Sequence, residues 1–283
     1  MRFSIVTPSF QSSQWLKLCV ASVADQGVES EHIVQDAGSS DGTLDWLPHD
    51  KRVKAFVEKD SGMYDAVNRG LKKSSGELCA YLNCDEQYLP GALRSVGEFF
   101  HENPSVEMVF GDCVIVNPNG EFLCHRKSLL PLHAHSCVSH NLSILSCATF
   151  FRRSVFEKHG LFFNSDLRDL GDAEWLVRCI RQKLPMALLN NFTSAFTNTG
   201  ENMSAKPNAQ RERKIFVSAA PRWARAMRPL IIAHHRVRKL AAGGYSGKPF
   251  QYRLYTQAGL ETRKVFEVKN PSGRWNADVS KPT

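Results

Sequence analysis

Carboxylates stand at three places in this 283-residue sequence where they could do chemistry. Asp36 ends one apolar run, Asp85 with Glu86 follows another, and Asp172 precedes the apolar stripe of a helical pattern. Carboxylate oxygens are the ligands that hard cations such as Mg²⁺ prefer. A carboxylate at the first turn of a helix can also accept a proton from an attacking hydroxyl. The residue types therefore predict metal binding and proton transfer, provided that the fold brings these groups together.

The elements that must position these groups are short strands separated by helical patterns. Strands are predicted at residues 4–7, 32–36, 53–57 and 78–82, with a helix at 65–73. This alternation indicates βαβ units and a mostly parallel sheet, whose ligands bind beyond the carboxyl ends of the strands. Polar groups from four segments are therefore expected at one edge of the sheet: residues 7–9, Asp36, 58–60 and 83–85.

The second half of the chain is less regular. It predicts strands at 106–110, 148–151 and 186–189, a hairpin turn at 117–120 and a helix at 172–182. The helix places Asp172 at its first turn, three and four residues before Trp175 and Leu176, so the carboxylate lies above the inward-facing stripe. The alternative is that Asp172 only caps the helix and interacts with its dipole.

Composition narrows the class of protein. No apolar run reaches the length of about 18 residues that a membrane span needs, and the short N-terminal run ends at Pro8, which favours a strand over a signal peptide. A cytoplasmic protein is expected.

The eight cysteines form no C-x-x-C pair, which favours buried thiols, and the histidines of 133–140 lack a second half of a zinc site. No G-x-G-x-x-G follows the first strand, which disfavours a dinucleotide-dependent oxidoreductase.

Five segments, taken in order, resemble glycosyltransferase family 2. They are 4–10 (SIVTPSF), 32–43 (HIVQDAGSSDGT), 58–70 (EKDSGMYDAVNRG), 82–93 (LNCDEQYLPGAL) and 150–160 (FFRRSVFEKHG) leading to 171–178 (GDAEWLVR). The resemblance covers about residues 2–205. It implies a GT-A fold over 1–205, with a nucleotide-binding half (1–110) and an acceptor half (111–205). It also implies inverting transfer of a sugar from a UDP- or GDP-linked donor to an acceptor hydroxyl, in polysaccharide or glycolipid biosynthesis.

The resemblance also implies roles for individual residues. Asp36 would bind the nucleotide base, with Thr7, Pro8 and Ser9 lining the pocket; alternatively, Asp36 and Asp41 only shape a turn. Asp85 would hold Mg²⁺ or Mn²⁺ against the diphosphate, beside Asn83 and Cys84. Further donor contacts are expected from Lys59, Asp60, Asp65 and Asn68. Asp172 would be the general base, with Glu174 as the first alternative and Asp169 as the second. Arg178 and Ser204 would belong to a loop that closes over the phosphates.

Asn83 stands where the family often has an acid. A nucleotide-sugar-binding protein without catalysis, or with weak metal dependence, is therefore the alternative function. One more departure is Ser146-Cys147, where many relatives have His-Gln.

The positive charge of the chain is concentrated near its C-terminus. Residues 206–253 contain twelve Lys or Arg and one acid, Glu212. A basic helical extension is predicted over 206–267, followed by a polar tail at 268–283. Five basic side chains could face anionic lipid headgroups: Arg222, Arg225, Arg236, Arg238 and Lys239. Trp223, Met227, Leu230 and Ile231 would bury, which places the enzyme on the inner face of a membrane near a lipid-linked acceptor. The alternative is packing on the catalytic domain. No nucleic-acid-binding module accompanies the charge.

Overall fold

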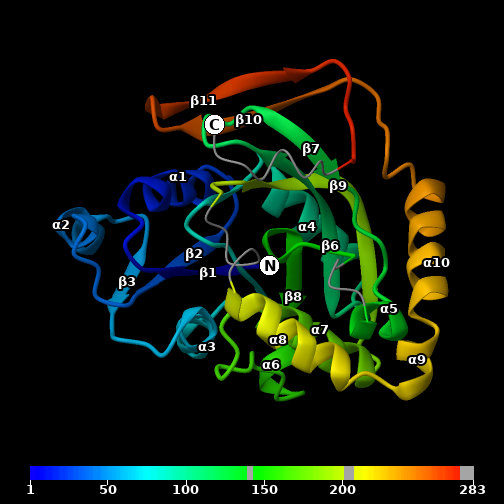
Figure 1. The fold of residues 1–283 in the computed structure, drawn as a ribbon. Coiled ribbons are helices and arrows are strands. Elements are labelled where there is room, and N and C mark those ends of the chain that lie inside the picture. Colours follow the sequence, from blue (N-terminus) through cyan, green and yellow to red (C-terminus); the bar gives the residue numbers. More distant parts are fainter. Residues whose placement is uncertain (139–142, 201–206, 275–283) are drawn as a thin grey trace.

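A computed structural model describes residues 1–138, 143–200 and 207–274 as an α/β protein with a curled central sheet between helices (Figure 1). The strands of the sheet are β1 (Phe3–Ser9), β2 (Ser30–Asp36), β3 (Lys54–Val57), β4 (Leu78–Tyr81), β5 (Glu86–Tyr88), β6 (Met108–Val116), β7 (Phe122–Arg126), β8 (Thr149–Arg152) and β9 (Met186–Thr197). Their order is β3-β2-β1-β4-β8-β6-β9-β5, and β7 pairs with β6.

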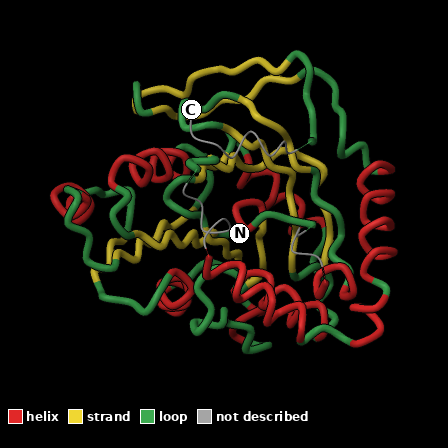
Figure 2. The backbone as a smooth tube through the Cα atoms, viewed as in Figure 1, coloured by secondary structure: helices red, strands yellow, loops and turns green. Residues whose placement is uncertain are grey.

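The helices lie on both sides of the sheet, as the red tubes around the yellow strands in Figure 2 show. Those that precede β9 are α1 (Ser13–Ala24), α2 (Thr43–Trp46), α3 (Met63–Lys73), α4 (Ala92–Glu102), α5 (His133–Val138), α6 (Ser154–Glu157) and α7 (Gly171–Arg181). After them come α8 (Pro207–Ser218), α9 (Arg222–Ala226) and α10 (Arg228–Ala241). No helix in these described ranges is long and apolar enough to cross a membrane.

The predicted parallel arrangement of the first four strands is confirmed. β1 pairs in parallel with both β2 and β4, and β2 pairs in parallel with β3. The central strands of the sheet are buried on both faces, since their alternate residues enter different cores. In β4, Leu78 and Ala80 pack with α1 and α4, whereas Cys79 and Tyr81 pack with α3, α6 and α7.

The second half departs from a purely parallel sheet. β8 is antiparallel to β4 and β6, while β9 is parallel to β6. The hairpin turn predicted at 117–120 is confirmed, because it joins β6 to the antiparallel β7. The short strand β5, which carries Glu86 and pairs with β9, was not predicted. Three residues are too few to show the period-2 pattern by which a strand is recognised.

The prediction that residues 206–267 are helical throughout is wrong for its last part. The structure has a two-stranded hairpin there, β10 (Phe250–Thr256) and β11 (Gly259–Val268). Tyr252 and Leu254 are buried while Gln251 and Arg253 are exposed, which is strand periodicity. The hairpin packs on the main sheet, and the Tyr252 hydroxyl donates to the Gly120 carbonyl at 2.7 Å. Most of the predicted tail at 268–283 lies outside the described residues.

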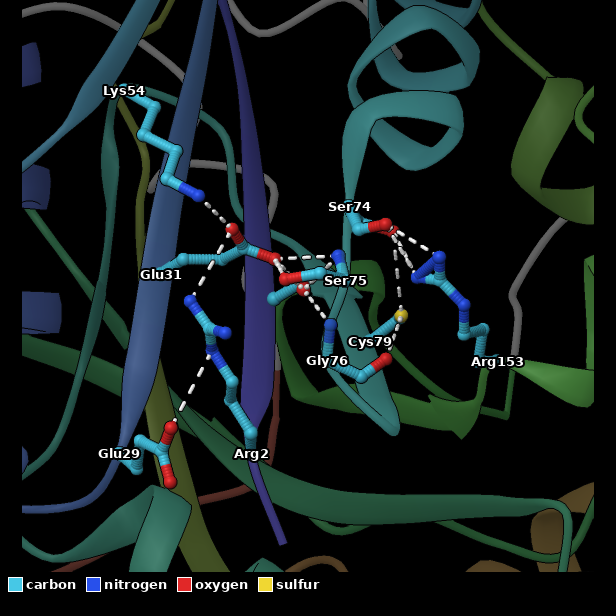
Figure 3. A network of polar contacts seen from close by, with 10 residues as sticks. Arg2, Glu29, Glu31, Lys54, Ser74, Ser75, Gly76, Cys79 and Arg153 are labelled. Atoms are coloured by element: carbon cyan, nitrogen blue, oxygen red, sulfur yellow. Dashed lines mark hydrogen bonds and ion pairs between the residues drawn. The ribbon is translucent and has the colours of Figure 1, made fainter.

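A buried ion network ties the strands together at their amino ends, opposite the predicted site (Figure 3). Glu31 of β2 accepts hydrogen bonds from Lys54 and from Ser4 and Ser75, at 2.5, 2.6 and 2.7 Å. Burial alone would raise the pKa of Glu31, but these hydrogen bonds lower it to about 2. The ionised carboxylate therefore stabilises the native state.

We expect Glu31→Gln to lower the free energy of unfolding at pH 7 by about 2 to 3 kcal/mol, since a buried charged hydrogen-bond network loses its acceptor. The lowered pKa means that this stabilisation is complete above the unfolded-state pKa of 4.5 and is lost as the pH falls towards 2. Urea unfolding at pH 7 and pH 3 measures both effects. Glu29→Gln is the control, because Glu29 is 77% exposed and lies 3.8 Å from Arg2. Equal losses for the two variants would contradict the prediction.

Candidate active site

The loop after β2 is organised around the Asp36 carboxylate. Its Oδ1 accepts hydrogen bonds from the backbone N–H groups of Gly38 and Ser39 at 2.9 and 2.7 Å. Its Oδ2 accepts from the hydroxyls of Ser9 and Ser39, both at 2.8 Å. The side chain is fully buried. Asp36 therefore fixes the shape of this loop and ties it to the end of β1.

The end of β1 is shared between the core and the sheet edge. The Thr7 hydroxyl is buried 2.8 Å from His32 Nε2 and 3.6 Å from Cys19 Sγ, so it faces the core. Pro8 is half-buried, and its carbonyl accepts a hydrogen bond from the Cys84 thiol at 3.2 Å. This bond joins the β1 end directly to the segment that follows β4.

Residues 83–86 form a tight turn between β4 and β5. Burial raises the pKa of Asp85 to about 6, so a bound cation would stabilise its ionised form. Glu86 is fully buried, and its Oε2 accepts from the Asn83 backbone N–H at 2.8 Å. Within the described part of the chain, Asn83 Oδ1 and Glu86 Oε1 are buried without a hydrogen-bond partner. Oxygen atoms of this kind fit a hard cation.

At the other side of the site, Asp172 begins α7 and contacts α3. Its Oδ1 accepts from the Ala173 N–H at 2.7 Å. Burial raises the pKa of Asp172 above its ordinary value, although hydrogen bonds from Ala173 and from the Tyr64 side chain lower it in part. A Cβ on Gly171 would lie 2.5 Å from Tyr64 Cδ2, so only glycine lets the tyrosine ring approach this turn. A raised pKa makes a carboxylate a stronger base.

Tyr81 connects the two acidic regions. Burial raises the pKa of its phenol, and the negative charges of Asp172 and of Glu86 raise it further. Both carboxylates are therefore close enough to Tyr81 to affect its ionisation. The pKa of Tyr64 is raised by burial, and the charges of Asp172 and Tyr81 raise it further. Phe163 stacks on Tyr64 and meets Tyr81 edge to face, with ring centroids 5.6 and 5.3 Å apart, and Gly171 lies against the Tyr64 ring. The start of α7 and the end of β4, which leads into the turn at 83–86, therefore lie against one aromatic cluster.

Several of the other predicted residues have structural partners. Asn68 is bonded twice to the Phe163 backbone, at 2.8 and 2.9 Å, and joins α3 to the segment before α7. Glu174 pairs with Arg178 at 2.8 Å, and Arg178 also donates to the Phe162 carbonyl. Asp65 pairs with Arg69 at 2.9 Å.

The remaining predicted donor contacts differ in exposure. Asp60 Oδ1 accepts from the Gly62 N–H at 3.0 Å, and burial raises its pKa. Lys59 is exposed beside it. Ser204 lies outside the described residues.

Tyr81 is a site residue that sequence reasoning missed, and Tyr64 was noted only as part of the donor segment. Both tyrosines lie among apolar residues, one in a buried strand and one in a helix, so their sequence context is that of ordinary core residues. Its position along the chain could have indicated this role. Tyr81 is the last residue of β4 and comes two residues before Asn83, where the predicted metal-binding turn begins.

The sequence is similar to that of known sugar-transferring enzymes. A family model described as "Glycosyl transferase family 2" matches residues 4–160. A PGL/p-HBAD biosynthesis glycosyltransferase of Mycobacterium bovis is 29% identical over 188 residues, covering 62% of this chain and 69% of that protein. The GalNAc(5)-diNAcBac-PP-undecaprenol beta-1,3-glucosyltransferase of Campylobacter jejuni is 31% identical over 121 residues, covering 40% of this chain and 38% of that protein.

Solved structures share the fold. S. aureus TarS 1-349 in complex with UDP has a TM-score of 0.58 at 17% identity, covering 85% of this chain and 72% of that chain. The mannosyltransferase PcManGT from Pyrobaculum calidifontis, in complex with GDP-Man and Mn²⁺, has a TM-score of 0.54 at 13% identity, covering 85% of this chain and 79% of that chain. The likeness to these two proteins confirms the predicted GT-A architecture. Because the family match spans more than half of the sequence, the chain belongs to glycosyl transferase family 2 and is a glycosyltransferase.

Proposed function

We propose that this enzyme is an inverting glycosyltransferase that moves a sugar from a UDP- or GDP-linked donor to an acceptor hydroxyl, with Mg²⁺ or Mn²⁺ held at Asp85. The observation that carries the proposal is the aromatic cluster of Tyr64, Phe163 and Tyr81, which joins the start of α7, where Asp172 lies, to the end of β4, where the turn at 83–86 begins. In that arrangement Asp85 can hold the cation that binds the leaving diphosphate, while Asp172 can accept the proton of the incoming hydroxyl. Inversion in a single displacement needs these two functions at opposite ends of the reacting bond.

In this mechanism, Asp172 accepts the proton of the acceptor hydroxyl as its oxygen forms the new bond to the sugar, and the bond to the diphosphate breaks. Tyr64 positions Asp172 by donating a hydrogen bond to its carboxylate. The Asp36 loop receives the nucleotide base at the end of β1, with Lys59 and Asp60 beside it. A divalent cation at Asp85, when bound, neutralises charge on the leaving diphosphate. Asn83 and Glu86 orient the turn that carries Asp85.

The donor and acceptor classes rest on the relatives. TarS and PcManGT were solved with UDP and with GDP-Man, respectively, and the C. jejuni relative is named for an undecaprenol-linked substrate. We therefore propose a nucleotide diphosphate sugar as donor and a glycan or lipid-linked acceptor, in polysaccharide or glycolipid biosynthesis. The site of action is then the cytoplasmic face of a membrane. A donor-binding protein without catalysis is the second candidate, because Asn83 supplies no charge to the metal.

A thermal-shift screen of nucleotide sugars with and without Mn²⁺ tests the donor class. A ligand that binds only the folded protein at about 100 times its Kd stabilises it by about 2.7 kcal/mol. We expect a UDP- or GDP-linked sugar to raise the melting temperature by several degrees when Mn²⁺ is present, and NAD to leave it unchanged. Hydrolysis of the same donor distinguishes an enzyme from a binding protein. No response to any nucleotide sugar would contradict the proposed function.

We expect Tyr64→Phe to lower kcat about tenfold and to leave the KM of the donor nearly unchanged, since the substitution removes only the hydroxyl that bonds Asp172. That hydrogen bond lowers the pKa of Asp172, so its loss raises the pKa, and the rising limb of the kcat–pH profile moves to higher pH. Tyr252→Phe, which removes a buried hydroxyl from the distant hairpin, is the control. An unshifted pH profile in Tyr64→Phe would show that Tyr64 only fills space.

A further inference from the structure

Helices α9 and α10 present a row of large apolar side chains to solvent. The exposed fractions are 56% for Trp223, 46% for Met227, 64% for Leu230, 61% for Val237 and 67% for Leu240. Leu230, Val237 and Leu240 are separated by seven and three positions, so they lie on one side of α10, and Trp223 of α9 and Met227 at the junction of the two helices are exposed just before them. A contiguous row of this kind on a folded protein marks a surface that another body covers. We call these five residues the α9–α10 face.

The opposite side of α10 is fixed to the catalytic domain. Ile231 is buried with Val138 and Val177. Arg238 donates to the Leu130 carbonyl and Lys239 to the Gly273 carbonyl, both at 2.7 Å. The sequence-based expectation that Ile231, Arg238 and Lys239 belong to the lipid-facing surface is therefore wrong. The fold uses them to hold α10, and the α9–α10 face is turned outward on a rigid support.

Exposed arginines flank the α9–α10 face. Arg222, Arg225 and Arg236 are exposed, and none has a hydrogen-bond or ion-pair partner within the residues that the structure describes. Neither helix contains an acidic residue. Guanidinium groups on long side chains can reach a plane of phosphates while the apolar side chains beside them enter a hydrocarbon layer.

From this surface we infer that the enzyme docks on an anionic lipid bilayer through the α9–α10 face, with both helices lying in the plane of the headgroups. The inference deepens the proposed function, because a lipid-linked acceptor would be presented at that surface. Charge complementarity favours a bilayer over a second copy of the chain, since two copies would bring their arginines together. The apolar row favours a bilayer over nucleic acid, because the charged phosphates of nucleic acid would gain no stabilisation from contact with the exposed aliphatic side chains.

Sedimentation with vesicles tests the inference without any sugar donor. We expect the full chain to bind vesicles of phosphatidylcholine with 30% phosphatidylglycerol far more tightly than vesicles of phosphatidylcholine alone, and to dissociate as salt is raised, since about 1 kcal/mol per basic residue comes from the surface potential. Leu230→Gln with Leu240→Gln should lower the partition coefficient at least tenfold. Leu260→Gln on the β10–β11 hairpin, where Leu260 is 44% exposed, is the matched control and should bind as the wild type does.

The double variant should keep the wild-type melting temperature and donor hydrolysis, because both leucines are exposed side chains of α10 and belong neither to the core nor to the elements that carry Asp85 and Asp172. Absence of vesicle binding by the wild type, or equal binding by the double variant, overturns the inference. A concentration-dependent dimer that the double variant loses overturns it in favour of a second copy. Vesicle binding in a protein that hydrolyses no donor leaves the docking surface standing and removes only the proposed function.

Discussion

Replacing Asp172 with asparagine is expected to lower kcat about 1,000-fold while the KM of the donor changes little. General-base catalysis contributes about 100- to 10,000-fold, and an amide cannot accept the proton of the attacking hydroxyl. The substitution keeps the size of the side chain and its hydrogen bond from the Ala173 N–H. Initial rates of sugar transfer, and of donor hydrolysis where no acceptor is known, measure the effect.

Asp169→Asn is the matched control for this experiment. Asp169 lies three residues before Asp172 and accepts a hydrogen bond from Asn208 at 2.6 Å, so it serves the packing of α8. We expect its kcat to stay within a few-fold of the wild type. Full activity in Asp172→Asn would contradict the assignment. If Glu174→Gln lost activity instead, the base would be Glu174, and its pairing with Arg178 would have to open during turnover.

The pH profile gives a second, independent test of Asp172. The base acts in its ionised form, and burial raises the pKa of Asp172 above the usual value of 3.8. The rising limb of kcat should therefore lie above the pH at which an exposed aspartate ionises. A rate that rises only at the ordinary pKa of aspartate would mean that Asp172 is not the group that accepts the proton.

Replacing Asp85 with asparagine is expected to remove most of the stimulation by Mn²⁺ and to lower kcat/KM at least 100-fold. The reason is that the proposed cation loses the carboxylate assigned to it, and an amide oxygen binds hard cations far more weakly than a carboxylate does. No group of three or more His, Cys, Asp or Glu in the described residues is placed to hold a metal ion, at 83–86 or elsewhere, so the proposed site uses Asp85 together with oxygen atoms of the donor. Activity as a function of Mn²⁺ concentration measures the loss.

Asp45→Asn on the exposed helix α2 controls for the removal of one negative charge and should leave the Mn²⁺ dependence unchanged. The wild type has a further property to check. Because burial raises the pKa of Asp85 to about 6, Mn²⁺ must compete with a proton there, and its apparent affinity should fall below pH 6. Mn²⁺ stimulation that survives in Asp85→Asn would place the cation elsewhere.

The strand ends of the site could be predicted from short-range patterns. Residues 4–7, 32–36 and 78–82 read as strands because apolar residues run together and end at polar ones, and β1, β2 and β4 have those ends within two residues. The glycines and serines of residues 38–42 likewise indicated the loop that Asp36 organises. The pattern could not say whether Asp36 faces a ligand or its own loop, because that depends on the hydroxyls of Ser9 and Ser39 reaching the same carboxylate.

The C-terminal region shows the limit more clearly. Its basic composition was visible in the sequence, but a count of charges gave no sign of the hairpin at 250–268. Arg253 lies on the exposed side of β10, whereas Tyr252 and Leu254 on the other side pack on the main sheet. Similarly, Ile231 and Leu230 are adjacent and equally apolar. Only their contacts decide that one is buried and that the other is 64% exposed.

By itself the sequence determined the first four strands of the sheet, the acids at their carboxyl ends and the family resemblance, since each depends on residues close together along the chain. The tertiary structure alone decided which acids share a tyrosine and which apolar residues of α10 face solvent. Asp172 and Glu86 are separated by many strands and helices in sequence. Both affect the pKa of Tyr81, because β4 is buried between two cores and one of its faces packs against α3 and α7. Side-chain environment is a long-range property, so it is fixed by packing and not by local pattern.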